Sequence, residues 1–199
     1  MSDTSAVLDC IQCLGGSDSE DFEEARTGAE RDFVKYSLVA SHKQYLDEAK
    51  LNHIGGSFRY ILSDDRLVPA KMTTFGGLYS VRGYPEDALV ADGGILASLE
   101  YRRCLVRGLG AEEAKKGGKI SRMIRPVDVS VLGFTDYGRA KVEDPVAGEK
   151  KAQDLWGVGL GTLITAGEHF EARIYYGWVL EEIERPSDGR TLADEGDGA

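Results

Sequence analysis

The sequence predicts an all-β protein built as an antiparallel meander, and three observations lead to this fold class. Six segments alternate apolar and polar side chains with period two, the pattern of strands that have one apolar and one polar face. No segment competes as an amphipathic helix, because the charged stretch at 111–119 is short and rich in glycine. The connections alternate between short and long, which is typical of a membrane β-barrel with brief turns at one end.

Three strands are predicted in the first half of the chain, at 31–42, 51–62 and 94–103. In each of them apolar residues recur at every second position, with mostly polar residues between them. The apolar faces carry Val34, Tyr36, Leu38 and Ala40, then Ile54, Phe58, Tyr60 and Leu62, then Ile95, Ala97, Leu99 and Tyr101. Glu100 therefore lies on the polar face of the third strand.

Three further strands are predicted at 126–136, 154–165 and 169–181. In the first, valines alternate with Asp128 and a serine, and Asp136 shares the polar parity. The bulky residues of the three strands gather on one face, namely Val127, Val129 and Val131, then Trp156, Val158, Leu160 and Ile164, then Phe170, Ala172, Ile174, Tyr176, Trp178 and Leu180. Parity alone does not decide whether these apolar faces meet lipid or a protein core.

The composition excludes some classes of function. The 199 residues carry a formal net charge of −10 and a pI near 4.8, which argues against a protein that follows nucleic-acid phosphates. No apolar stretch of about 18 residues is present, so a transmembrane helix is excluded, whereas membrane strands are not. The opening residues MSDTSAVLDC lack the basic and apolar regions of a secretory signal peptide.

The longest connection, 63–93, contains the stretch SVRGY, which places Arg82 alone in a glycine-rich loop. A loop held inside a water-filled lumen needs an anchor, and arginine offers a planar fork of donors that grips a carboxylate in two places. Asp136, on the polar face of its strand, is the expected partner, and Glu100 is the second candidate. Gly83 would let the loop turn tightly beside the arginine.

Each of these patterns also has a plain structural interpretation. An R-G-Y in a loop is usually a turn with a solvated arginine, and the stretch FTDYG at 134–138 is usually a strand that ends in an Asx turn. The two patterns nevertheless occur one strand apart, between loops of alternating length. Their combination favours a functional pair over a coincidence.

The same residues resemble the signatures of a known family. SVRGY, preceded by FGGLY and followed by DGGILASLEYR, resembles the lumenal loop of the outer-membrane translocators of two-partner secretion, the haemolysin activation/secretion protein family. The matching positions are Val81, Arg82, Gly83 and Tyr84 of the VRGY loop, and Phe134, Asp136 and Gly138 of the F-x-D-x-G motif of the same superfamily. The resemblance extends over residues 15–199.

The resemblance implies transport without chemistry. It implies a 16-stranded transmembrane β-barrel in the cell outer membrane, in contact with lipid, whose lumenal loop is fixed by Arg82, Asp136 and Glu100. The partner would be a secreted exoprotein of haemolysin or adhesin type, which passes the pore in unfolded form without ATP. No enzyme activity, cofactor or nucleic acid is expected.

The chain departs from the family pattern at both ends. About six strands are predicted, too few to close a barrel, so the sequence is interpreted as a C-terminal barrel part that forms an incomplete, open sheet. Residues 1–28 are predicted to form a partial strand and an acidic loop. Residues 29–199 are predicted to hold the C-terminal barrel strands, with the final strand missing. Periplasmic domains and a signal peptide, expected of a full-length member, are not found in this sequence.

No pattern indicates a catalytic residue or a metal site. The histidines lack the spacing of metal ligands, at His42, His53 and His169, and no nucleophile elbow suggests a hydrolase. Cys10 and Cys13 form a lone C-x-x-C and, like Cys104, are expected to be incidental thiols.

Two other functions stay open at this point. A barrel-assembly factor of the same superfamily would share the fold and differ in its client protein. A soluble, lipocalin-like β-rich binding module would invert the faces, so that the apolar side chains form the core and the polar side chains meet solvent.

Overall fold

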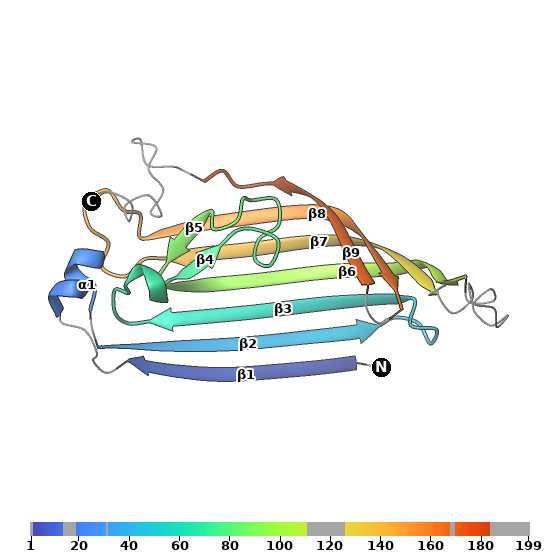
Figure 1. Ribbon diagram of the computed structural model, residues 1–199, viewed down its shortest axis with the longest axis horizontal. Helices are drawn as coiled ribbons and strands as arrows, with labels where there is room; N and C mark the ends of the chain where they lie inside the picture. Colours follow the sequence, from blue (N-terminus) through green and yellow to red (C-terminus); the bar gives the residue numbers. More distant parts are fainter. Residues whose placement is uncertain (1, 14–18, 31, 111–125, 168–169, 184–199) are drawn as a thin grey trace.

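The computed structural model describes residues 2–13, 19–30, 32–110, 126–167 and 170–183, and their fold is an open antiparallel sheet (Figure 1). Its strands are β1 (Ser2–Cys13), β2 (Phe33–Tyr45), β3 (Asn52–Ser63), β6 (Gly93–Leu109), β7 (Val127–Lys141), β8 (Ala152–Ala166) and β9 (Phe170–Val179). Each strand pairs with the next one of this series, in the order β1-β2-β3-β6-β7-β8-β9. The predicted fold class, an all-β antiparallel meander, is confirmed.

The first 30 residues contain more regular structure than the sequence pattern indicates. β1 pairs with β2 along its whole length, and a short helix, α1 (Ser19–Ala25), lies in the predicted acidic loop. β1 was predicted only in part, because Val7 and Ile11 lie on the same face as Ser5 and Asp9 and interrupt the alternation of apolar and polar residues. No helix among the described residues is long and apolar enough to cross a membrane.

Two strands extend well beyond their predicted ends. β6 continues to Leu109 through two register shifts, between Cys104 and Val106 and between Val106 and Leu109. A shift of this kind breaks the period-two pattern, so the sequence signal stops before the strand does. β7 continues to Lys141 over a stretch in which glycine, alanine and charged residues give no apolar face. The tail from 184 to 199 and the stretch at 111–119 lie outside the described residues.

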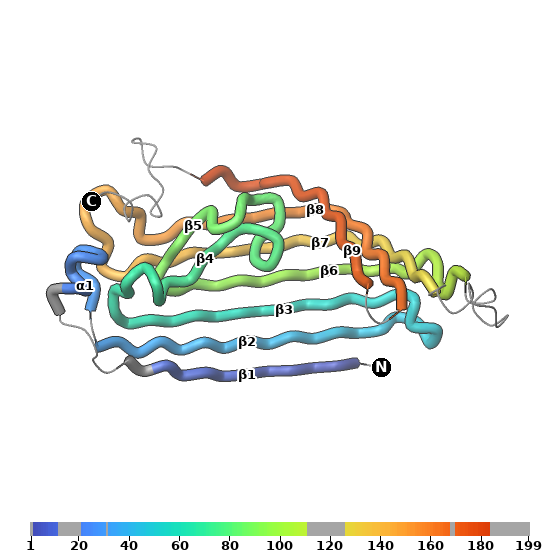
Figure 2. The backbone as a smooth tube through the Cα atoms, viewed as in Figure 1, coloured from blue at the N-terminus to red at the C-terminus, as the bar shows by residue number. Residues whose placement is uncertain are grey.

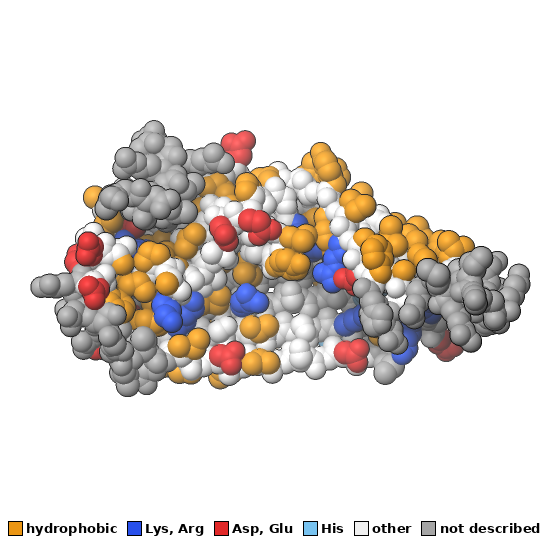
Figure 3. Space-filling view, viewed as in Figure 1, with side chains coloured by type: hydrophobic (Ala, Val, Ile, Leu, Met, Phe, Trp, Pro, Cys, Tyr) orange, Lys and Arg blue, Asp and Glu red, His pale blue; other side chains and the backbone are white. Residues whose placement is uncertain are grey.

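The sheet separates two kinds of surface. Its outer face exposes large apolar side chains, including Leu99, Leu160 and Ile174, which are each more than half exposed. The opposite face, here called the lumenal face, is polar, and one rung of paired residues crosses it through Ser5, Ser41, Ser57, Ser98 and Asp136. Figure 3 shows that charged side chains are scattered over this face. The apolar side chains are therefore not packed into a closed interior, as a soluble module requires.

The long connection between β3 and β6 is a folded arm rather than a plain loop. It contains a 3-10 turn, η1 (Pro69–Lys71), and a hairpin of β4 (Thr73–Phe75) with β5 (Leu89–Ala91). Figure 2 shows this arm in front of β6, β7 and β8. The main core lies between the arm and the sheet, and it consists of Phe75, Val81, Tyr84, Ala91, Ala140, Val142 and Leu155. Packing against the lumenal face thus gives the arm a fixed place.

We expect a charge on the outer face to impair folding in a bilayer, and the same charge on the lumenal face to be tolerated. Leu99→Arg adds a guanidinium to the outer face of β6, which at the depth of the bilayer midplane costs about 2–4 kcal/mol. Ser57→Arg adds the same group to the lumenal face of β3. The measurement is a urea titration of each variant in lipid vesicles, and equal destabilisation by both substitutions would contradict this assignment of the faces.

Candidate functional site: a latch between the long arm and the sheet

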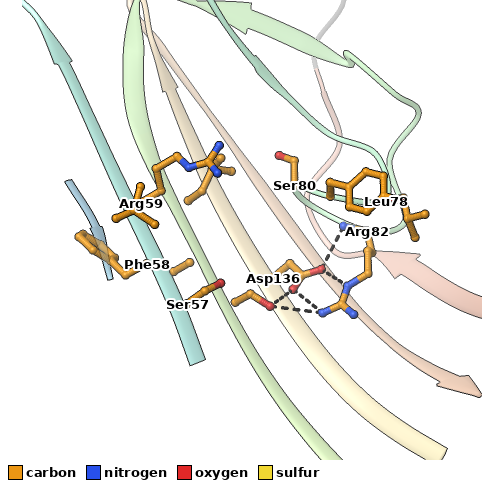
Figure 4. Close-up of a pocket in the computed structure, with 12 residues that line it drawn as sticks. Ser57, Phe58, Arg59, Leu78, Ser80, Arg82 and Asp136 are labelled. Atoms are coloured by element: carbon orange, nitrogen blue, oxygen red, sulfur yellow. Dashed lines mark hydrogen bonds and ion pairs between the residues drawn. The ribbon is translucent and has the colours of Figure 1, made fainter. Parts of the chain in front are cut away.

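The tip of the arm is the segment 76–88, between β4 and β5. Arg82 reaches from this tip to Asp136 on β7, and both residues are buried, at 9 % and 1 % exposure (Figure 4). The Nε and Nη2 atoms of Arg82 donate to Oδ2 and Oδ1 of Asp136 at 2.7 and 2.9 Å. The backbone N–H of Arg82 donates to Oδ2 as well, at 3.1 Å. The carboxylate of Asp136 therefore binds both the side chain and the backbone of Arg82. The bidentate geometry fixes the direction of the guanidinium.

Glu100 and Ser98 complete this contact from β6. Nη1 of Arg82 donates to Oε2 of Glu100 at 2.9 Å, and the Ser98 hydroxyl donates to Oδ1 of Asp136 at 2.6 Å. Arg102, two residues further along β6, donates to the other oxygen of Glu100 at 2.7 Å. Arg82, Asp136 and Glu100 are hereafter called the latch. Every nitrogen of the Arg82 side chain has an acceptor, which buried charge requires.

Two aromatic rings on the lumenal face enclose the guanidinium. The Cζ atom of Arg82 lies 3.6 Å from the ring centroid of Phe134 and 5.2 Å from that of Tyr175. The two rings meet edge to face, with their centroids 6.0 Å apart. A cation over an aromatic face gains electrostatic attraction, most of all where water is excluded. Phe134 thus contacts the latch directly, whereas the sequence motif alone assigned it no role.

The residues on either side of Arg82 attach the tip to β7 and β8. Val81 is fully buried and packs over Gly138, where a Cβ would come within 2.8 Å of its Cγ2 atom. Tyr84 is also buried, and its hydroxyl accepts from the backbone N–H of Trp156 at 3.0 Å and donates to the carbonyl of Glu181. Val81 and Tyr84 therefore supply apolar packing and backbone hydrogen bonds around the ion pair.

The tip approaches the strands closely because three positions there are glycine. Gly83 has a φ of +104°, a conformation that side chains rarely adopt. A Cβ on Gly157 would lie 2.1 Å from the carbonyl oxygen of Arg82, and a Cβ on Gly177 would lie 2.8 Å from the Cα of Gly83. The seat on β8 and β9 is therefore shaped for bare backbone, and larger residues there would displace the tip.

The arrangement suits the holding of the arm in one place. Within the described part of the chain, no group of three or more His, Cys, Asp and Glu side chains is placed to hold a metal ion. The net free energy of a buried ion pair is small, because desolvation offsets attraction, whereas removal of one partner costs about 3–5 kcal/mol. The latch is therefore expected to select one position of the arm more than to stabilise the sheet.

The latch residues and the motif positions around them were predicted from the sequence, whereas Ser98, Tyr175 and Gly177 were not. Ser98 faces Asp136 in the register of β6 and β7, and Tyr175 lies on β9, three strands from β6. Their parity places both on the lumenal face, but only the register shows that Ser98 pairs with Asp136 and that Tyr175 pairs with Gly161, on another rung. Gly177 carries no sequence signal of its own.

The remaining candidates from the sequence lie away from the latch. His42 contacts Thr4 at 2.8 Å between exposed side chains, and His53 packs beside the ring of Tyr45. Cys10 and Cys104 are free thiols. Cys13 and His169 lie outside the part of the chain whose side chains the structure describes.

We expect Gly157→Ala to unseat the tip even though every latch residue stays in place. The added methyl must move the Arg82 carbonyl by more than about 1 Å, and overpacking of this kind costs ~1–3 kcal/mol. The readout is the labelling rate of a thiol at position 81, in a background where the native cysteines are serine. Gly55→Ala is the matched control, because a Cβ on this lumenal glycine meets nothing within 4 Å. Similar rates in the two variants would refute the glycine seat.

The family model of the haemolysin secretion/activation protein ShlB/FhaC/HecB matches residues 6–164, a span that contains the arm and all three latch residues. Searches of the curated proteins and of the solved structures each gave no match.

The family match covers most of the chain, and neither the barrel-assembly factor nor the soluble binding module is favoured by it. Members of the matched family are outer-membrane β-barrel proteins of two-partner secretion, which act with a secreted exoprotein partner. The strand-rich fold, with its apolar outer face, fits this class of protein. The chain belongs to the haemolysin secretion/activation protein family.

Proposed function

We propose that this protein secretes its partner exoprotein, in unfolded form, through the lumen of its β-barrel, and that the latch keeps the arm in the lumen until the partner passes. The observation that carries the proposal is the buried contact of Arg82 with Asp136, which holds a folded arm against the lumenal face. An arm in this place obstructs one side of a pore. A transporter therefore needs a contact that is specific and reversible.

The lumenal face leaves space for an extended chain on the other side. The arm tip covers β7, β8 and β9, whereas a hollow of about 500 Å³ lies over β1, β2, β3 and β6. A second cavity of about 160 Å³ separates the arm from β2 and β3, where the labelled Arg59 side chain lies opposite Leu78 (Figure 4). Most of the residues that line the larger hollow are polar, with serines and charged side chains among them, so a hydrated polypeptide would find hydrogen-bonding partners there.

The proposal requires no ATP and no catalysis. The latch consists of hydrogen bonds and ion pairs whose net free energy is small, because the cost of burying the charges offsets their attraction. A passing polypeptide can displace such a contact by offering its own polar groups to Arg82 and Asp136. Contact of the outer face with membrane lipid completes the proposed setting, since this face exposes apolar side chains along every strand pair.

We expect Arg82→Ala and Asp136→Ala, each in the full-length transporter, to lower secretion of the partner severalfold while the barrel still inserts. Arg82→Ala leaves the buried carboxylate of Asp136 without its cation, and Asp136→Ala leaves Arg82 with Glu100 as its one remaining carboxylate. Loss of one partner of a buried ion pair costs about 3–5 kcal/mol in the latched state. Arg82→Lys is expected to lie between the wild type and Arg82→Ala, because the charge stays and the fork is lost. The assay compares partner in the medium with transporter in the outer membrane.

Arg139 and Asp154 provide the matched control for this experiment. They form an exposed ion pair at 3.2 Å, near the end of β7 and the start of β8 rather than in the middle of the outer face, and exposed pairs contribute only about 0–1 kcal/mol. Alanine at either position should leave secretion unchanged. An exchange of the two latch charges, Arg82→Asp with Asp136→Arg, should restore part of the loss, although not the stacking on Phe134. Normal secretion in both single latch variants would sink the proposed function of the latch.

A further inference from the structure

A second buried cluster of charges lies where the arm joins the sheet. It consists of Arg26, Arg66, Asp92 and Glu149, here called the rim cluster, whose side chains are 9 %, 3 %, 0 % and 16 % exposed. Arg66 follows β3 and Asp92 immediately precedes β6, so these two residues mark the two ends of the arm. Arg26 comes from the connection between β1 and β2, and Glu149 from the connection between β7 and β8. Three connections thus meet in one neutral set of two cations and two anions.

Asp92 ties the two ends of the arm to each other and to both neighbouring connections. Its carboxylate accepts from Nη1 of Arg26 at 2.6 Å and from the backbone N–H of Leu67, at the other end of the arm, at 2.9 Å. It also accepts from the backbone N–H of Glu143, just beyond β7, at 2.9 Å. A carboxylate with this many donors holds their segments at fixed distances.

Arg66 makes the same kind of junction from the cationic side. It donates to both oxygens of Glu149, at 2.6 and 2.8 Å, and to the carbonyl of Thr27 at 2.8 Å. The hydrogen bonds from Arg66 hold the pKa of Glu149 below its usual range, so this carboxyl stays ionised and paired. The backbone N–H of Glu30 in turn donates to the carbonyl of Arg66 at 3.0 Å.

The rim cluster and the latch attach the arm to the sheet at two separate places. The residues between them include the hairpin of β4 and β5, whose three paired positions connect the rim to the tip. No hydrogen bond among the described residues joins a rim cluster side chain to a latch side chain. Breaking one attachment therefore need not disturb the other.

We propose that Arg66 and Asp92 are positioning residues that hold both ends of the arm at the rim, so that the arm turns about the rim cluster as a hinge when the latch opens. The purpose of this movement rests on the proposed secretion function, whereas the hinge concerns only how the arm is attached to the sheet. It assigns the moving part to the tip and the adjoining end of the hairpin, at Phe75 and Leu89. The fixed part consists of Arg66, Asp92 and the base of the hairpin, where Thr73 pairs with Ala91.

The test uses two thiol reporters in the full-length transporter in whole cells, with Cys10, Cys13 and Cys104 replaced by serine. Val81→Cys reports the tip and Ala91→Cys reports the base, because both native side chains are fully buried. A membrane-impermeant maleimide then labels whichever part of the arm is released. Labelling of a protected site follows the population of its open state.

Arg82→Ala is expected to raise labelling at position 81 by about tenfold or more and to leave position 91 within about twofold. Asp92→Asn is expected to do the reverse, and Arg66→Lys to raise labelling at position 91 less strongly. Asp87→Asn, the same change at an exposed site of the arm, should alter neither rate. Heat-dependent mobility in gels checks that each barrel is folded. If Asp92→Asn does not insert, Arg66→Lys decides the test.

Release of both reporters by Arg82→Ala would overturn the hinge, because the arm would then move as one block. Protection of position 91 in folded Arg66→Lys and Asp92→Asn would overturn it as well, because the rim cluster would then not hold the base. These outcomes are independent of secretion. The hinge can stand if Arg82→Ala secretes normally, and it can fall while secretion is lost.

Discussion

The place of the arm depends on one buried guanidinium. Arg82 carries its charge into the contact between arm and sheet, where the free energy of an unpaired charge would be prohibitive. The carboxylates of Asp136 and Glu100, on neighbouring strands, remove that cost only if the tip sits at one height and in one orientation. The backbone follows the side chain, because Asp136 also accepts from the N–H of Arg82.

The contact divides the lumenal face into two unequal parts. On β7, β8 and β9, glycines and a stacked Phe134 form a seat that the tip fills. On β1, β2 and β3, serines of the same rung leave an open polar surface. The strands thus combine a site for the arm with free space beside it. Under the proposed function, the filled part would be the obstruction and the open part the path of the partner, and the rim cluster would set where the obstruction begins.

Much of this fold follows from alternation along single strands, because the period of two assigns each residue to a face. Parity and one loop motif were enough to select Arg82, Asp136 and Glu100 as candidates, while their role as an anchor stays a prediction. Ser98 and Tyr175 could not be predicted as neighbours of the latch, because their contacts depend on the register between strands. Arg66 and Asp92 escaped because connections have no period, and their partners are far away in sequence. β1 was only partly foreseen, since Val7 and Ile11 interrupt its polar face.

In the proposed mechanism, the tip rests on the lumenal wall and leaves it while a partner passes. The most direct measurement is the distance between spin labels at Tyr79, on the exposed tip, and at Leu160, on the outer face of β8, in the full-length transporter in lipid. The resting protein should give one narrow distance distribution. A transporter with a partner stalled in its pore should add a second population at a different distance. An identical narrow distribution in both states would show that the tip stays on the wall while the partner passes, against the proposed mechanism.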